Sequence, residues 1–264
     1  MLRRKAPVFI VTLLVTASLL TVFSGCRGVT QTIVGSGNLI TQEMDATDFT
    51  KLEISHVFQA TVTRSDSFSV TITVDNNLLG YVVVRKSGST LRIYLKAGYA
   101  YIGTTKMVEI TMPKIDKLSL SGASQGEVNG FRSSQPLEFE ASGASSLNID
   151  DIKAGDTGFE ISGASHISGG IEISEGRFNV SGASSIDLEG FASDISLEVS
   201  GASQANLTDF PVSNATVRIS GASAVIVNAS GSIDGNVSGA SSLIYLDDPT
   251  LTIEMSGDST VDNR

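Results

Sequence analysis

The chain has 264 residues, enough for one large domain or two small ones. Its formal net charge of -10 argues against the basic face that nucleic-acid binding needs, and the absence of Trp removes the best stacking platforms for sugars or bases. Abundant Gly together with Ser, Thr, Val and Ile is typical of β structure with many tight turns.

The first 25 residues have the pattern of an export signal. A basic start, Met1–Lys5, precedes an apolar run, Val8–Phe23, that is short for a membrane span of about 20 residues. Two small residues, Ser24 and Gly25, then follow. We therefore predict that residues 1–25 are a signal peptide.

The only cysteine of the chain, Cys26, comes directly after this run. Phe23-Ser24-Gly25-Cys26 resembles a bacterial lipobox, in which the cysteine is lipidated and becomes the new N-terminus, although Phe23 stands where Leu is usual. We expect lipidation at Cys26 and hence a membrane partner reached through the lipid anchor. Simple secretion and an uncleaved anchor are the alternatives, and residues 26–37 would form a short polar tether.

Residues 38–118 are predicted to form irregular β rungs at the start of the folded body. Apolar and polar residues alternate there with a period of two, which indicates strands with one buried face. Turn residues separate the strands, as in Asp75-Asn76-Asn77 and Lys86-Ser87-Gly88-Ser89. An abutting β-sandwich is a second interpretation. The predicted strands are Leu52–Ile54, Ala60–Thr63, Val70–Val74, Leu91–Leu95 and Val108–Met112.

Residues 119–264 repeat one short motif. SGAS begins at Ser121 and returns every 18 to 21 residues, ending as SGDS at Ser256. Counted from the first serine of each motif, the residues three and one positions before it and five positions after it are mostly apolar. Polar residues lie between them. This is again a strand pattern, and self-similarity at about 20 residues indicates a solenoid whose coils cannot bury a core alone. The prediction is an all-β, single-stranded parallel β-helix of about 20 residues per coil.

The motif then serves as the corner of each coil. Glycine permits the positive φ of a tight turn, Ala fits a crowded inner corner, and the two serines bond backbone groups or the serine of the next coil. The glycines that we predict to form this structural turn ladder are Gly122, Gly143, Gly163, Gly182, Gly201, Gly221, Gly239 and Gly257.

Several stretches together resemble one known family. They are Gly35–Thr41, Asp75–Leu79, Gly88–Ile93, and Met112-Pro113 leading into Leu118–Ser124. In this order they resemble the DUF2807 family of head GIN domain, or auto-transporter adhesin, proteins over about residues 35–264. The resemblance implies a right-handed parallel β-helix, a cell-envelope location and a role in adhesion. It implies no catalytic or ligand-binding residue.

Two motifs suggest catalysis and are weak. Gly122-Ala123-Ser124-Gln125-Gly126 matches the nucleophile elbow, yet no helix pattern follows it and the sister copies lack the second Gly. His166 occupies an outward position where other coils carry Gln, Ser, Ala or Thr, and His56 is the only other histidine. We predict no catalytic residue, no cofactor and no zinc or other metal site.

Carboxylates are the remaining candidates. Asp150-Asp151, Asp209 and Asp247-Asp248 supply oxygen ligands of the kind that Ca²⁺ takes, but they sit where solvated turns are expected. Three outward acids could belong to a carbohydrate site, although Asn179 would separate two of them and no basic partner repeats beside them. These acids are Glu138, Glu160 and Glu198.

Taken together, the sequence predicts a non-enzymatic bacterial envelope lipoprotein, facing periplasm or exterior, that presents a rigid surface for adhesion or scaffolding. Its partner would be a surface protein or a glycan. A carbohydrate-binding or carbohydrate-active β-helix would show an outward cluster of acids with Arg or Lys, or an aromatic row, on one face. An envelope-stress or sensory partner protein would show an exposed apolar patch.

Overall fold

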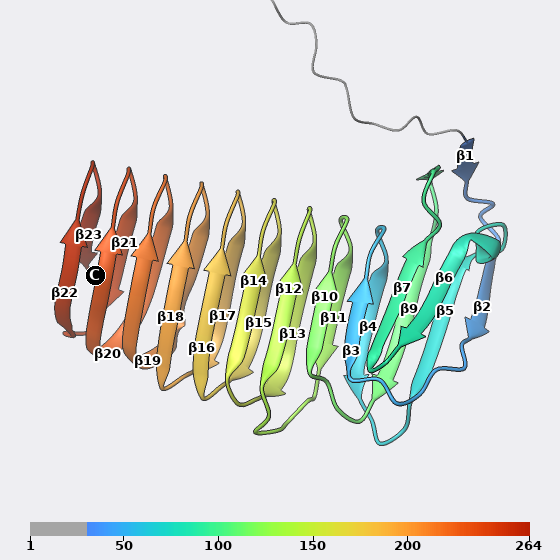
Figure 1. Ribbon diagram of the computed structural model, residues 1–264, viewed down its shortest axis with the longest axis horizontal. Coiled ribbons are helices and arrows are strands. Elements are labelled where there is room, and N and C mark those ends of the chain that lie inside the picture. Colours follow the sequence, from blue (N-terminus) through green and yellow to red (C-terminus); the bar gives the residue numbers. More distant parts are fainter. Residues whose placement is uncertain (1–30) are drawn as a thin grey trace, which may run out of the picture.

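The computed structural model describes residues 31–264, and they form a rod of strands stacked side by side (Figure 1). The predicted signal peptide and Cys26 lie outside the described residues. Apart from one short 3-10 helix, η1 (Leu79–Tyr81), every element of the described part is a β-strand. Among residues 31–264 there is no helix with the length and apolarity needed to cross a membrane.

Each coil contributes one strand to each of two facing sheets, which confirms the predicted right-handed parallel β-helix with about 20 residues per turn (Figure 1). The first sheet contains, in spatial order, β6 (Val82–Ser87), β7 (Thr90–Leu95), β3 (Lys51–Ile54), β10 (Lys117–Leu120), β12 (Leu137–Ala141), β14 (Thr157–Ile161), β16 (Glu175–Val180), β18 (Asp194–Val199), the later parts of β19 (Gln204–Ile219) and β20 (Ala224–Val237), and β22 (Thr250–Met255).

The second sheet runs parallel to the first along the rod and closes each coil. It contains, in spatial order, β2 (Leu39–Glu43), β5 (Ser69–Asp75), β9 (Lys106–Met112), β4 (Gln59–Arg64), β11 (Gln125–Asn129), β13 (Ser146–Lys153), β15 (His166–Glu172), β17 (Ser185–Phe191), the first parts of β19 and β20, β21 (Ser242–Leu246) and β23 (Thr260–Asn263).

The N-terminal end differs from the coils because antiparallel strands close it. β5 pairs antiparallel with β9, β2 pairs antiparallel with β5, and β6 pairs antiparallel with β7. A separate two-stranded ribbon, β1 (Gln31–Val34) with β8 (Tyr99–Ile102), lies against this end. We call the described strands up to Met112 the N-terminal cap, although β3 and β4 within it already form a coil of the solenoid type.

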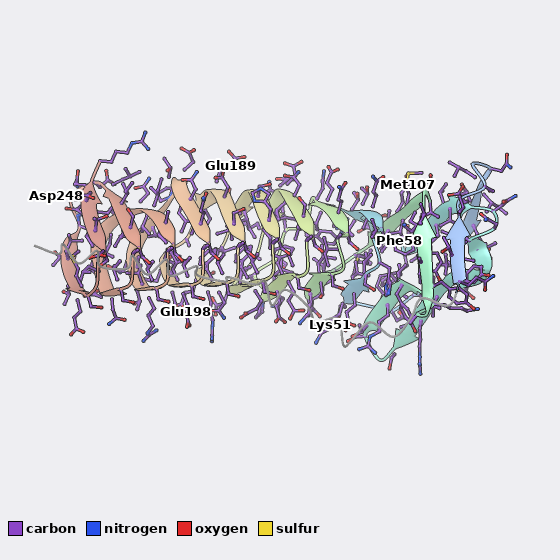
Figure 2. All side chains as sticks on the ribbon, turned by 90° about the horizontal axis from the view of Figure 1, so that it is seen from above. Lys51, Phe58, Met107, Glu189, Glu198 and Asp248 are labelled. Atoms are coloured by element: carbon purple, nitrogen blue, oxygen red, sulfur yellow. The ribbon has the colours of Figure 1, made fainter. Side chains whose placement is uncertain are left out.

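The core is a continuous column of apolar side chains between the two sheets. Residues at the predicted inward positions, such as Phe159, Ile161 and Ile167, are at most 1% exposed. Seen along the strands, charged side chains such as Glu189 and Glu198 project from opposite sheets, whereas Phe58 lies between them (Figure 2). Three phenylalanines stack in successive coils: Phe159 lies 5.5 Å from Phe139 and 4.8 Å from Phe178 between ring centroids.

Glycine in each corner is required for two reasons. All eight predicted turn glycines have positive φ, between 65° and 83°. In the stacked corners there is also no room for a Cβ: one built on Gly182 would lie 2.5 Å from the carbonyl oxygen of Gly163. A larger residue would therefore be strained in its backbone and would collide with the neighbouring coil.

The prediction that the motif's alanine faces inward is wrong. In the middle coils, Ala144, Ala164 and Ala183 are exposed, and it is the second serine that points into the coil. These serines are at most 2% exposed, and several donate their hydroxyl to the carbonyl oxygen of the first serine, as in Ser145 to Ser142 at 2.8 Å. The buried serines are Ser124, Ser145, Ser165, Ser184, Ser203, Ser223 and Ser241.

Candidate functional site

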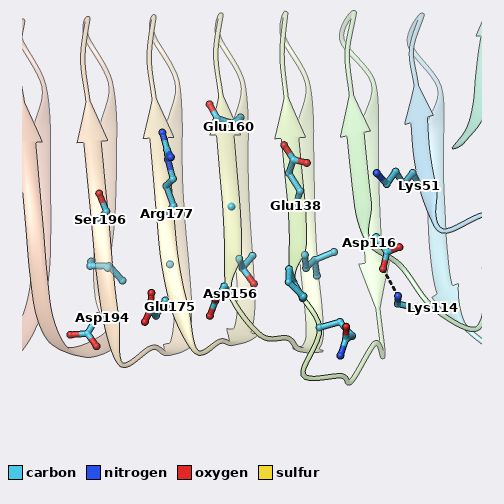
Figure 3. A pocket seen from close by; sticks show the side chains of 17 residues that line it. Lys51, Lys114, Asp116, Glu138, Asp156, Glu160, Glu175, Arg177, Asp194 and Ser196 are labelled. Atoms are coloured by element: carbon cyan, nitrogen blue, oxygen red, sulfur yellow. Dashed lines mark ion pairs between the residues drawn. The ribbon is translucent and has the colours of Figure 1, made fainter. Parts of the chain in front are cut away.

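A groove of about 910 Å³ lies on the outer face of the first sheet and extends from Lys51 of β3 to Ser196 of β18 (Figure 3). Outward side chains from successive coils, such as Glu138 and Arg177, lie in register along it because the strands are parallel, and buried residues at the strand starts, such as Leu137 and Ile195, also line it. The lining residues are Lys51, Lys114, Asp116, Gln135, Pro136, Leu137, Glu138, Asp156, Thr157, Gly158, Glu160, Glu175, Gly176, Arg177, Asp194, Ile195 and Ser196.

Two irregular segments bound the groove toward the cap. The connection before β10 brings Lys114 and Asp116, whose Nζ and Oδ1 atoms form an ion pair at 2.8 Å. The connection from β11 to β12, residues 130–136, is longer than the two- or three-residue connections that precede β14, β16 and β18, and it supplies Gln135 and Pro136. These segments flank the groove on its cap side, where Lys51 of β3 also lines it.

The floor of the groove is recessed in the middle, because a glycine without a side chain stands there in a row of paired residues. Glu138 pairs in register with Gly158, and Gly158 with Arg177. A Cβ on Gly158 would meet only the Cγ atom of Glu138 within 4 Å, at 3.9 Å, so the space above it is open. Glu138 and Arg177 therefore flank a gap that is one side chain wide, with an acid on one side and a base on the other (Figure 3).

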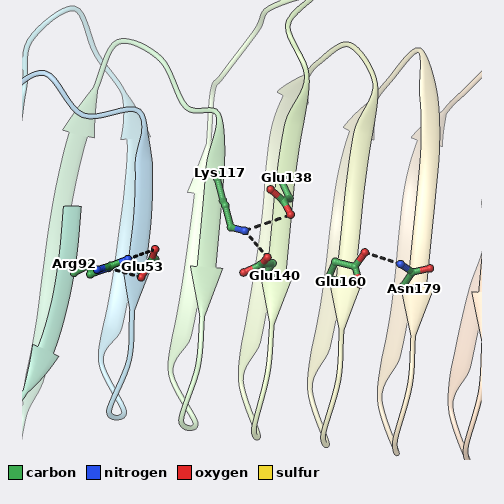
Figure 4. A network of polar contacts seen from close by, with 7 residues as sticks. All are labelled: Glu53, Arg92, Lys117, Glu138, Glu140, Glu160 and Asn179. Atoms are coloured by element: carbon green, nitrogen blue, oxygen red, sulfur yellow. Dashed lines mark hydrogen bonds and ion pairs between the residues drawn. The ribbon is translucent and has the colours of Figure 1, made fainter. Parts of the chain in front are cut away.

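A network of polar contacts continues along the same sheet beside the groove (Figure 4). Lys117 Nζ lies 3.3 Å from Glu138 Oε1 and also forms a hydrogen-bonded ion pair with Glu140. Asn179 donates its amide to Glu160 Oε1 at 2.5 Å. Glu138 and Glu160 thus each have a donor that orients the carboxylate.

Lys117 also affects the protonation of Glu140. Burial opposes the charged form of Glu140, but the hydrogen bond and charge of Lys117 outweigh it, so the pKa of Glu140 lies below its ordinary value. By the same balance, the pKa of Lys117 lies above its ordinary value, because bonds to Glu140 and Glu138 exceed its desolvation. At neutral pH, the pair presents fixed charges of both signs.

Two of the three predicted outward acids line this groove. Glu138 and Glu160 lie within it, whereas Glu198 is farther along the sheet, and Asn179 stands between Glu160 and Glu198 in the ladder as the spacing predicted. The sequence shows no basic partner that repeats beside these acids, and the structure adds a single base there, because Lys117 contacts Glu138. Lys117 lies four residues before the first serine of its SGAS motif, as Glu138, Gly158 and Arg177 do before theirs. The repeat spacing therefore already places Lys117 in the same row of paired residues as Glu138.

The serine and the two histidines that the sequence offers as weaker catalytic candidates lie in three separate places. Ser124 of the G-x-S-x-G match is fully buried and donates its hydroxyl to the carbonyl oxygen of Ser121 at 2.8 Å. His166 is partly buried on the second sheet, with Nδ1 2.8 Å from Ser185 Oγ. His56 lies in the turn of the first coil, with Nδ1 2.8 Å from Ser55 Oγ. Each histidine thus contacts a serine hydroxyl, but within residues 31–264 no carboxylate hydrogen-bonds to either imidazole to complete a triad.

The turn carboxylates occupy a different part of the surface. Asp150, Asp151 and Asp209 line a shallow hollow of about 540 Å³ on the second sheet, where Arg132 forms an ion pair with Asp151. Asp247 and Asp248 follow β21 near the far end of the rod. Within residues 31–264, no group of three or more His, Cys, Asp or Glu side chains is arranged to hold a metal ion.

Comparison with known proteins gives a family and a fold. The family described as "Putative auto-transporter adhesin, head GIN domain" (DUF2807) matches residues 48–249. No curated protein sequence is significantly similar. A solved structure titled "Putative lipid binding protein" from Parabacteroides distasonis is 20% identical, has a TM-score of 0.81, and covers 88% of this chain and 99% of its own.

Two further solved structures have titles that describe adhesins. One from Parabacteroides merdae is 17% identical, with a TM-score of 0.80, and covers 88% of this chain and 99% of its own. One from Parabacteroides distasonis is 18% identical, with a TM-score of 0.81, and covers 88% of this chain and 100% of its own. At such low identity, these similarities establish the solenoid fold and leave the binding partner to be argued from the surface.

Proposed function

The chain belongs to the DUF2807 family of head GIN domain proteins, and on that premise we propose that it is a non-enzymatic adhesin of the bacterial envelope. Lipidation of Cys26 would tether it to a membrane, and the solenoid would present its first sheet to a ligand. The family description supports a surface role. The stacked coils support rigidity, because each coil is bonded along its length to both neighbours.

We propose a glycan chain as the ligand of the groove, and the groove with its flanking charges carries this assignment. Fixed carboxylates of Glu138 and Glu160 can accept hydrogen bonds from hydroxyl groups, and Arg177 can donate them. Successive rows repeat at about 4.8 Å, close to the length of one sugar ring along a chain. Because the groove crosses several coils, an extended polymer could lie along it.

A polypeptide fits this groove less well than a glycan. Extended peptides commonly bind by adding a strand to a free sheet edge. The strands under the groove, β10 to β18, are each paired on both sides, so they offer no free backbone groups. Recognition there must use side chains alone, which suits hydroxyl-rich ligands with many donors and acceptors.

The protonation of Glu140 and Asp116 argues against either of them acting as a catalytic acid. A glycosidase needs one carboxylic acid whose pKa is raised so that it can protonate the leaving group. Beside the groove, the pKa of Glu140 is shifted downward by Lys117, and that of Asp116 is shifted downward because its bonds with Lys114 and Thr50 exceed its desolvation. These shifts keep the carboxylates of Glu140 and Asp116 ionised at neutral pH.

The test is a glycan-array screen of mature protein carrying Cys26→Ala, followed by titration of any bound glycan. Gly158→Leu should block the floor and abolish binding, and Arg177→Ala should weaken it severalfold. Gly170→Leu is the matched control, because Gly170 is an outward glycine on the second sheet whose Cβ would have the flexible Glu189 side chain as its nearest neighbour. Binding that survives Gly158→Leu but is lost in Gly170→Leu would move the site to the other sheet and refute the proposal.

A further inference from the structure

Exposed apolar residues gather at the N-terminal end of the rod. Four of the eight large apolar side chains that are most exposed in the described chain belong to β1, β2 and β8. Val34 and Ile102 are 61% and 57% exposed and stand opposite each other in the ribbon. Leu39 and Ile40 open the neighbouring edge strand β2. We call Val34, Leu39, Ile40 and Ile102 the apolar end patch.

The structure holds this patch in place instead of letting it fold inward. The buried carboxylate of Asp75 accepts the backbone N–H groups of Gly37 and Thr105, both at 2.7 Å, and so fixes the chain on either side of the ribbon. The N–H of Gly35 donates to the carbonyl oxygen of Ile102 at 3.0 Å. An apolar surface that is exposed and rigidly supported indicates a contact with something outside the chain.

Aromatic residues support the ribbon from its other side. Tyr81, next to the cap, lies 4.9 Å from Tyr99 and 6.0 Å from Tyr101 between ring centroids. Tyr101 donates its hydroxyl to the carbonyl oxygen of Lys96 at 2.7 Å, and Lys96 Nζ lies 6.0 Å from the Tyr81 ring. The ring cluster thus leaves the opposite side of β8, with Ile102, facing outward.

Charge is distributed very unevenly along the rod. Residues 31–112, which form the cap, contain seven basic and seven acidic residues. Residues 113–264, which form the coils, contain seven basic and 21 acidic residues. A lipid surface with anionic headgroups would therefore repel the coils and leave the cap unaffected.

The place where the chain enters the ribbon favours a lipid surface over other occupants. Five peptide steps separate Cys26 from Gln31, at most about 18 Å of chain. The second sheet runs from β2 to β23, about 50 Å at about 4.8 Å per strand. A lipid anchor on Cys26 would hold the apolar end patch close to the bilayer and would allow the last coil to stand far from it.

We propose that the apolar end patch docks on the lipid bilayer to which Cys26 is anchored, and that this contact, with the acidic coils repelled, stands the rod upright. The inference rests on the proposed lipid tether. It assigns to the cap the function of orienting the groove away from the membrane. A second copy of the chain at this patch is the competing occupant.

Energy transfer from the far end of the rod to the bilayer tests the orientation. The lipidated chain with Asp258→Cys carries a single free thiol, which takes a donor dye, and vesicles of phosphatidylethanolamine and phosphatidylglycerol carry acceptor lipid. Low transfer is expected for the parent. Val34→Ser with Ile102→Ser should raise transfer because the rod would tilt freely, whereas Phe191→Ser, an exposed apolar change outside the patch, should leave it low.

Three readings separate failure of this inference from failure of the tether. Mass measurement of the N-terminal peptide decides lipidation independently of orientation. With lipidation present, transfer that is unchanged by Val34→Ser and Ile102→Ser refutes the docking. A patch-dependent dimer in sedimentation, with transfer unaffected, would assign the patch to a second copy and would also overturn the proposal.

Discussion

The backbone N–H of Ser145 donates a hydrogen bond to the hydroxyl oxygen of Ser165 in the next coil, at 3.2 Å. The same bond recurs from Ser165 to Ser184 at 3.3 Å and from Ser223 to Ser241 at 3.3 Å. Because these groups are buried, each bond satisfies a backbone donor that water cannot reach. The serine ladder therefore joins neighbouring corners in addition to the strand pairing.

Removing one hydroxyl from this ladder should destabilise the protein. Ser184→Ala leaves the N–H of Ser165 buried without its acceptor, at a cost of about 1–3 kcal/mol in the free energy of unfolding. Ala183→Leu changes an exposed residue in the same turn and should shift stability by no more than about 0.5 kcal/mol. Urea unfolding of both variants measures the difference, and an Ala183→Leu variant that loses more than Ser184→Ala would contradict the ladder.

The glycine of a stacked corner should be less replaceable than the glycine of the groove floor. Gly182→Ala forces a side chain into a φ of 82°, which alone costs about 1–2 kcal/mol, and places Cβ 2.5 Å from the carbonyl oxygen of Gly163. Gly158→Ala meets no atom closer than 3.9 Å and should be neutral or slightly stabilising. Thermal unfolding of the two variants side by side checks this, and equal losses would show that corner stacking is not the cause.

The solenoid could be predicted from sequence because each coil repeats the same inward positions. Phe159 and Phe178 lie three residues before their motifs, and their side chains stack as equal positions in parallel coils must. The direction of a turn side chain could not be predicted in the same way. Ala183 and Ser184 are both small, and only the backbone conformation after Gly182 decides which one enters the coil.

The candidate site was less predictable than the fold because it depends on contacts between coils. Glu138 and Glu160 were identifiable as outward acids, but the Lys117 contact depends on side-chain reach across neighbouring strands. The groove wall at Gln135 and Pro136 comes from an irregular connection with no repeat to define it. The antiparallel pairing of β2, β5 and β6 also follows no period, since these strands cover the end of the solenoid.

Low pH should destabilise the N-terminal cap, because it protonates the carboxylate of Asp75. The N–H groups of Thr105 and Gly37 stabilise its carboxylate and outweigh its burial, so its pKa in the folded protein lies below the value of about 3.9 in the unfolded chain. Its contribution to stability is therefore complete above that unfolded value and is lost as the pH falls through the folded pKa.

Replacing this carboxylate should make the free energy of unfolding depend less on pH in the acid range. The Asp75→Asn variant should be less stable than the parent at neutral pH. Its free energy of unfolding should then fall less than that of the parent between about pH 5 and pH 2. Asp66→Asn is the control, because Asp66 is exposed and its ion pair with Arg64 is at the surface. Urea midpoints across this range decide the outcome, and parallel curves for the parent and Asp75→Asn would rule out a role for Asp75 in acid unfolding.

The phenylalanine stack should have a large but local effect. Phe159 is fully buried between Phe139 and Phe178, so Phe159→Ala should cost about 3–5 kcal/mol, whereas Phe191→Ala, at a side chain that is 49% exposed, should cost little. Because each coil contacts only its neighbours, hydrogen-exchange protection should fall mainly in β12, β14 and β16 and persist in β3 and β4. A uniform loss of protection along the chain would mean instead that cap and coils unfold as one cooperative unit.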